Sequence, residues 1–192
     1  MKKLLTLLIL PLGIHAQKAT DIKQAKTNTT AIIVNSGIGF QVHDQPFTNA
    51  SAQVDLLRHG IGVYRDFENH QIGGLVEFAI DNTGDVGNIE IAPQLQLNRI
   101  FEIGKHSLYG GGTVGYKYID HGALNPGAIS IGYLLGLQTG FVFNLSKRFA
   151  TSLDVGVRSA QMWQTKQGLY EQHINRYFLL YFPVTAGVRY KF

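Results

Sequence analysis

The sequence predicts an all-β fold, an eight-stranded antiparallel up-and-down barrel that spans a membrane. Three observations lead to this prediction. Apolar residues recur at every second position through much of the chain, the N-terminus has the pattern of an export signal, and only 16% of the residues are charged, against about 25% in soluble domains. No segment after the N-terminus is apolar for long enough to form a membrane helix, so entry into lipid requires a closed barrel whose backbone groups pair internally.

The N-terminal segment has the three parts of a secretory signal. Lys2 and Lys3 precede an apolar run over 4–13 (LLTLLILPLG), and Ala16 is a small residue at the expected cleavage position. The run is too short for a helical span, which needs about 20 residues. We therefore expect a signal peptide over 1–16, a polar tail over 17–28, and the outer-membrane barrel over 29–192.

The first three expected strands are the least regular. They cover about 30–43, 52–66 and 72–81, and the third is short. In the second strand, His59 and Arg65 have the same parity as the apolar residues around them. This indicates a bulge or a late entry into the membrane there.

The remaining five strands show the alternation more clearly, apart from the Gly-rich fifth. They are expected at about 89–98, 108–119, 129–144, 149–158 and 177–192. Connections after the second, fourth and sixth strands are short, whereas those after the first, fifth and seventh are longer; the connection at 82–87 is short and departs from this pattern. Short periplasmic turns and longer outer loops are typical of outer-membrane barrels.

The composition of the polar face indicates that the apolar face points outward. A soluble ligand-binding barrel would carry Lys and Glu on its polar face, whereas here that face is mostly Gly, Ser, Thr, Gln and Asn. Eight strands enclose a space that side chains just fill. The charges expected inside nearly neutralise one another; they are Glu77, Glu90, Lys117, Asp154, Arg158, Arg189 and Lys191. Aromatic residues near strand ends on the apolar face are expected to form interfacial girdles, namely Phe143, Phe149, Trp163, Phe178 and Phe192.

The last eight residues carry a recognisable motif. Thr185, Gly187, Tyr190 and Phe192 occupy the polar, glycine, aromatic and terminal aromatic positions of the outer-membrane β-signal. With this motif, the chain after the signal peptide resembles the small eight-stranded outer-membrane barrels, the class of the OmpA transmembrane domain and OmpX. The resemblance implies a location in the cell outer membrane of a Gram-negative bacterium and recognition by the barrel-assembly machinery. It also implies contact with outer-membrane lipid and lipopolysaccharide.

Evidence for chemistry in the sequence is sparse. The chain has no Cys, which excludes thiolate sites and disulfides within it, and the His spacings predict no metal site. We expect no cofactor. A His with a nearby Ser and carboxylate is the minimum for nucleophilic hydrolysis, and the rim candidates for it are His121, Ser130 and His173. The formal charge of +4 includes Lys2 and Lys3, so no nucleic-acid partner is predicted.

The predicted function is a structural or surface-interaction role for a monomeric barrel with a plugged polar lumen, without enzymatic activity. Two alternatives remain open. One is a lipid A-modifying enzyme, either an acyl hydrolase or a transferase, which a His–Ser contact at the rim would favour. The other is a narrow porin-like channel or a carrier of small hydrophobic molecules, which a continuous lumen or a lateral gap beside an apolar pocket would favour.

Overall fold

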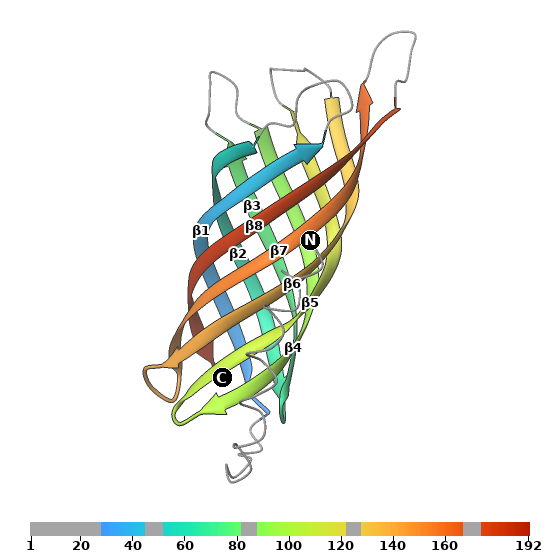
Figure 1. Ribbon diagram of the computed structural model, residues 1–192. Helices are drawn as coiled ribbons and strands as arrows, with labels where there is room; N and C mark the ends of the chain where they lie inside the picture. The colour runs from blue at the N-terminus through green and yellow to red at the C-terminus, as the bar shows by residue number, and fades with distance from the viewer. Residues whose placement is uncertain (1–27, 45–51, 82–87, 122–127, 167–173) are drawn as a thin grey trace, which may run out of the picture.

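The protein is one closed antiparallel barrel in which every strand pairs with its neighbours in chain order (Figure 1). The computed structural model describes residues 28–44, 52–81, 88–121, 128–166 and 174–192. The strands are β1 (Thr30–Asp44), β2 (Ala52–Phe67), β3 (His70–Asp81), β4 (Asn88–Ile103), β5 (His106–Asp120), β6 (Ala128–Asn144), β7 (Phe149–Lys166) and β8 (Ile174–Lys191). The predicted fold class is therefore confirmed. The predicted signal peptide and all but the last residue of the predicted tail lie outside the described residues.

Short connections join the strands at one end of the barrel, which we call the turn end. Glu68 and Asn69 link β2 to β3, and Gly104 and Lys105 link β4 to β5. Gly104 has a φ of 63°, in the left-handed region that glycine adopts without a steric penalty. A slightly longer turn over 145–148 links β6 to β7. Phe192 also lies at the turn end, and we call the opposite end, where β1, β3, β5 and β7 finish, the loop end.

Most of the large apolar residues of the strands face outward, and the alternate residues face inward. Leu95, Leu135 and Phe182 are 64%, 59% and 38% exposed, although side chains of this kind are normally buried in a water-soluble protein. Their chain neighbours Gln94 and Leu134 are buried inside the barrel. The predicted orientation of the two faces is therefore right. Within the described residues, no helix has the length and apolarity needed to cross a membrane.

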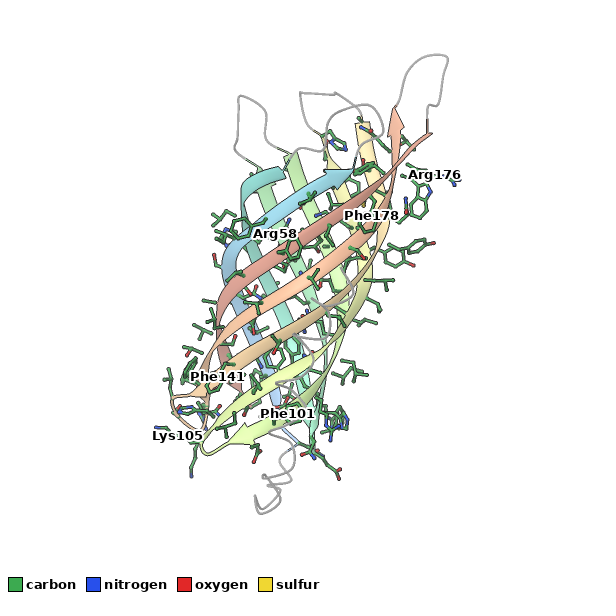
Figure 2. The ribbon with its side chains drawn as sticks, in the orientation of Figure 1. Arg58, Phe101, Lys105, Phe141, Arg176 and Phe178 are labelled. Carbon is green, nitrogen blue, oxygen red and sulfur yellow. The ribbon has the colours of Figure 1, made fainter. Side chains whose placement is uncertain are left out.

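Aromatic side chains form two belts on the outer face. Near the loop end, the Tyr133 ring lies 5.3 Å from Tyr116 and 5.4 Å from Trp163, measured between ring centroids. At the turn end, the Tyr190 ring lies 5.1 Å from both Phe149 and Phe192. Belts at two heights, separated by aliphatic residues, have the arrangement of the interfacial girdles of membrane barrels. Figure 2 shows Phe178 toward one end of the barrel and Phe101 and Phe141 toward the other.

Several strand details differ from the sequence predictions. His59 and Arg65 are exposed in regular register, so no bulge occurs at either residue. The register instead shifts where Gly39 pairs with Leu56 and Phe40 pairs with Val54, which leaves one extra residue in β2 as in a β-bulge. Strands β4 and β7 also continue beyond their predicted ends, to Ile103 and Lys166, because the alternation weakens there while the backbone pairing persists.

Two prolines interrupt the pairing of neighbouring strands. Between β4 and β5 the register passes directly from Ile91–Tyr118 to Gln94–Gly115, across Pro93. Between β7 and β8 it passes from Val155–Val184 to Arg158–Tyr181, across Pro183. Proline has no backbone N–H to donate to a ladder, so one side of the strand loses its regular pairing at each site.

Candidate functional site: the filled interior and the loop-end rim

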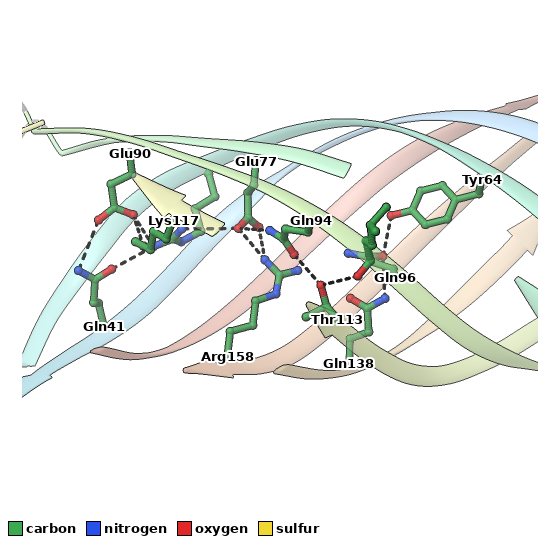
Figure 3. A network of polar contacts seen from close by, with 12 residues as sticks. Gln41, Tyr64, Glu77, Glu90, Gln94, Gln96, Thr113, Lys117, Gln138 and Arg158 are labelled. Atoms are coloured by element: carbon green, nitrogen blue, oxygen red, sulfur yellow. Dashed lines mark hydrogen bonds and ion pairs between the residues drawn. The ribbon is translucent and has the colours of Figure 1, made fainter. Parts of the chain in front are cut away.

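Five charged side chains from five strands form one buried ionic network in the loop-end half of the barrel. Each is exposed by 5% or less, and Figure 3 shows the contacts of the network. Its members are Arg58, Glu77, Glu90, Lys117 and Arg158. Arg158 donates two hydrogen bonds to Glu77, at 2.7 and 2.6 Å. A buried charge is tolerated only when it is paired in this way.

Arg58 joins the two halves of the ionic network. Its Nη2 lies 3.1 Å from Glu90 Oε2, and its Nη1 lies 3.7 Å from Glu77 Oε2. Lys117 Nζ lies 2.6 Å from the same Glu90 oxygen. Gln41 accepts a hydrogen bond from Arg58 and donates one to Glu90. The network therefore links strands β1 to β5, and it reaches β7 through Arg158.

The ring of Tyr181 lies among the three cations of the network. Arg58 Cζ and Lys117 Nζ are each 4.4 Å from the ring centroid, and Arg158 Cζ is 5.8 Å from it. Tyr181 itself is fully buried. Because the face of an aromatic ring is electron-rich, it attracts cations. Tyr181 on β8 thus supplements the two carboxylates as a partner for three positive charges.

Uncharged polar side chains continue the filling toward the turn end. Gln94 donates to Glu77, and Thr113 donates to Gln94. Gln96 accepts hydrogen bonds at 2.7 Å from both Tyr64 and Gln138. Further down, Gln138 also donates to Asn98, which donates in turn to Gln71.

A second charged group lies near the turn end. Asp154 accepts hydrogen bonds from Tyr109 and Ser152, and Arg189 Nη2 lies 3.8 Å from one of its carboxylate oxygens. Lys191 donates to Asn144. Polar contacts therefore occupy the described interior at successive levels from Gln41 down to Asp154.

An apolar cluster lies beside the ionic network in the loop-end half, so polar groups are not the only filling of the predicted plugged polar lumen. Leu134, Met162 and Leu179 are each exposed by 1% or less and point inward. The cluster also contains Ala92, Ile119, Ala160, Tyr177 and Tyr181. These residues have the inward parity of their strands, which the sequence indicated, but nothing in the alternation distinguishes them from the polar inward residues.

Inward glycines provide the space that the large interior side chains occupy. A Cβ built on Gly39 would lie 2.3 Å from Arg58 Nε, and one on Gly136 would lie 2.7 Å from Arg158 Cγ. Atoms at these distances overlap, so any larger residue would displace the arginine beside it. Glycine is therefore needed at these two positions because it leaves room for the buried arginines.

The structure places six of the seven predicted lumen charges in two groups. Glu77, Glu90, Lys117 and Arg158 belong to the ionic network, and Asp154 and Arg189 form the second group. Lys191 is half-buried at the turn end. Arg58 is the functional residue that the sequence analysis missed, although its parity is opposite to that of His59 and Arg65 and thus pointed inward. The irregular alternation of β2 obscured this signal.

At the loop-end rim, two of the three predicted catalytic candidates are in contact. His121 Nε2 and Ser130 Oγ are 2.7 Å apart. Partial burial lowers the pKa of His121, which favours the neutral imidazole that can accept the Ser130 proton. Ser130 is fully buried, so a substrate could reach its oxygen only after a rearrangement. His173 lies outside the described residues.

The motif residues at the end of the chain lie on the two faces of β8. Thr185 and Gly187 face inward, and a Cβ on Gly187 would lie 3.1 Å from Asn35 Cβ. Tyr190 and Phe192 belong to the turn-end aromatic belt. Strand β8 pairs with β1 from Phe178 to Lys191 and closes the barrel.

An apolar groove follows the outer face of β3 to β6. Two adjoining hollows of about 500 and 650 Å³ share Leu95, Val114 and Leu135 in their walls. The larger hollow lies beside Pro93, where the β4–β5 pairing is interrupted. Behind it, the interior is occupied by Ala92 and Lys117, which are 2% and 0% exposed. The interrupted pairing therefore does not open a path into the lumen.

Comparison with known proteins supports the fold. No protein-family model matches the sequence, and no curated protein resembles it significantly. Among solved structures, Neisserial surface protein A matches with a TM-score of 0.66 and 9% identity, over 86% of this chain and all of that chain. The outer membrane protein AlkL matches with a TM-score of 0.63 and 13% identity, over 91% of this chain and 94% of that one. The outer membrane protein OprG from Pseudomonas aeruginosa matches with a TM-score of 0.57 and 14% identity, over 90% of this chain and 99% of that one.

These neighbours are outer-membrane barrels, and they share the fold of this chain at very low sequence identity. The predicted resemblance to small eight-stranded outer-membrane barrels is confirmed at the level of fold. The narrower likeness to the OmpA transmembrane domain and OmpX stays a prediction. Fold alone does not specify an activity, because one fold can support many functions.

Proposed function

We propose that this protein is a monomeric outer-membrane barrel with a plugged lumen, which acts through its surfaces in a structural or interaction role. The single observation that carries the proposal is the reversal of the usual distribution of side chains. Apolar residues cover the outside, whereas ion pairs and hydrogen-bonded amides fill much of the inside. Lipid is the solvent that makes this arrangement stable, because water would favour the opposite one.

The filled interior supports a surface role over a pore. The ionic network spans the lumen from Glu90 on β4 to Arg158 on β7. The apolar cluster occupies further space at the same end. A channel would require these side chains to separate and leave charges unpaired in a medium of low dielectric constant, which is costly.

The expected partners follow from this proposal. Outer-membrane lipid would cover the aliphatic band between the two aromatic belts, and lipopolysaccharide would surround the loop end. During biogenesis the barrel-assembly machinery would recognise Thr185, Gly187, Tyr190 and Phe192 on β8. The export signal over 1–16 would direct the chain out of the cytoplasm.

Refolding of residues 17–192 into detergent micelles and lipid vesicles tests the proposal. We expect a folded barrel that migrates differently on gels before and after boiling and that gives no steady conductance in a planar bilayer. A stable single-channel conductance would contradict the plugged lumen. Failure to insert into either medium would contradict the membrane location.

The contact between His121 and Ser130 supports a second candidate, hydrolysis of an acyl ester at the outer rim. The burial of Ser130 weighs against it, because a nucleophile must reach the substrate. Assays of the refolded protein on lipid A and on a soluble acyl ester, beside Ser130→Ala, decide between the two candidates. Activity that Ser130→Ala removes would establish the enzyme, and equal background from both proteins would exclude it.

A further inference from the structure

Two arginines project from the outer face at the turn end, where a membrane protein meets lipid headgroups. Arg65 on β2 and Arg99 on β4 have outward parity and are exposed. They flank β3, because Arg65 pairs with Ile72 and Arg99 pairs with His70. His70 and Ile72 are successive outward residues of β3, so the two cations lie on either side of one short stretch of that strand.

Each arginine is held against an aromatic ring of its own strand. Arg65 Cζ lies 5.0 Å from the Phe67 ring centroid, and Arg99 Cζ lies 5.5 Å from that of Phe101. Neither guanidinium forms an ion pair in the part of the chain that the structure describes. The neighbouring carboxylate of Asp66 points inward, where it accepts a hydrogen bond from Gln71. Glu68 and Glu102 are exposed nearby without pairing to either arginine. The guanidinium N–H groups are therefore available to an external anion.

The apolar groove begins directly beside this pair of arginines. Ile72, the strand partner of Arg65, lines the smaller of the two hollows together with Leu97. The floor includes Gly112, where an added Cβ would have no contact closer than 3.7 Å. From there the groove continues along Leu95 and Val114 to Tyr116 and Tyr133 of the loop-end belt. A cationic end joined to a long apolar channel matches an anion that carries a hydrocarbon chain.

We propose that this surface binds one anionic phospholipid, with the phosphate between Arg65 and Arg99 and an acyl chain in the groove. The inference rests on the proposed function, since it requires the outer face of the barrel to lie in a bilayer. Two unpaired cations favour a net negative headgroup such as phosphatidylglycerol over a zwitterionic one. With the turn end in the periplasm, the bound lipid belongs to the inner leaflet of the outer membrane.

Native mass spectrometry of the refolded protein in detergent tests the proposal, with phosphatidylglycerol and phosphatidylcholine added separately. We expect preferential retention of phosphatidylglycerol. The double variant Arg65→Gln/Arg99→Gln should lower that retention by about tenfold or more, and a tenfold loss corresponds to about 1.4 kcal/mol for the two arginines together. Gly112→Leu, which fills the groove while keeping both arginines, should also lower it.

Lys147→Gln/Arg148→Gln is the matched control, because it removes two exposed cations from the turn between β6 and β7 at the same end of the barrel. It should leave retention unchanged. Equal retention of both lipids, or an equal loss in the control, would overturn the lipid site and leave the membrane barrel intact. A protein that does not refold in detergent would instead count against the proposed function, so the two failures are distinguishable.

Discussion

Two opposite walls of the loop-end interior are both buried, but one is lined mainly by charged side chains and the other mainly by apolar ones. The wall formed by β2 to β4 carries Arg58, Glu77 and Glu90, whereas the wall formed by β6 to β8 carries Leu134, Met162 and Leu179 and adds Arg158 to the ionic network. Both walls are almost inaccessible to solvent. Tyr181 belongs to both, since it packs in the apolar cluster while its ring contacts the cations.

The difference shows how the cost of a substitution depends on what remains behind. An apolar side chain that is removed leaves a cavity, whose cost grows with its volume. A charged side chain that is removed leaves its partners buried without compensation, which costs more than the pair contributed. We therefore expect single substitutions to cost more stability in the ionic wall than in the apolar wall. Replacing the whole ionic network with apolar residues, by contrast, would cost little.

The largest effect is expected from Glu77→Gln. The substitution preserves the shape of the side chain but leaves Arg58 and Arg158 with one carboxylate fewer, and we expect a loss of about 3–5 kcal/mol in the free energy of unfolding. Urea unfolding of the refolded barrel in vesicles measures it. Glu68→Gln in the exposed β2–β3 turn is the control and should change stability by less than about 0.5 kcal/mol. Similar losses in both variants would remove the distinction between buried and exposed carboxylates.

The apolar wall should respond less strongly. Leu179→Ala deletes a fully buried side chain inside the barrel, and we expect a loss of about 2–4 kcal/mol under the same conditions. Val188→Ala on the lipid-facing side of the same strand should cost less than about 1 kcal/mol, because detergent or lipid fills the vacated space. A larger loss for Leu179→Ala than for Glu77→Gln would reverse the proposed ranking of the two walls.

The smallest loss of stability is expected at Tyr181, which lies between the two walls. Tyr181→Leu keeps an apolar residue but removes the ring face that Arg58 and Lys117 contact, and we expect a loss of about 1–2 kcal/mol. Tyr181→Phe retains the ring and should lose less than half as much in the same unfolding measurement. Equal effects of Leu and Phe would show that the hydroxyl, and not the ring face, carries the contribution of Tyr181.

Much of the barrel could be predicted because its determinants are local in the sequence. The two-residue period of β6 and β8 predicted which side chains face outward, and Leu135 and Phe182 do so. Short turns after β2, β4 and β6 were likewise predicted from the lengths between apolar segments. The same reasoning placed Glu77, Glu90 and Arg158 on the inward face, since parity requires only the strand that carries each residue.

The candidate site was harder to predict because its contacts join distant strands. Glu77 and Arg158 are 81 residues apart, and they meet only because the barrel is closed and each strand has one particular register. The inward position of Arg58 was missed because His59 and Arg65 share the parity of apolar neighbours in β2. The groove beside Arg65 and Arg99 is lined by outward glycines from different strands, Gly74 on β3 and Gly112 on β5, and no local pattern connects them.

The sequence by itself determined that the chain forms strands with one apolar and one polar face, because alternation depends only on the geometry of an extended backbone. It also determined the number of strands and the side on which the turns are short. Closure of the barrel decided the rest. The tertiary structure brought three cations, two carboxylates and one tyrosine ring together. It also gathered most of the ionic groups on one wall and the large apolar side chains on the other, because register and strand tilt set which inward residues share a level.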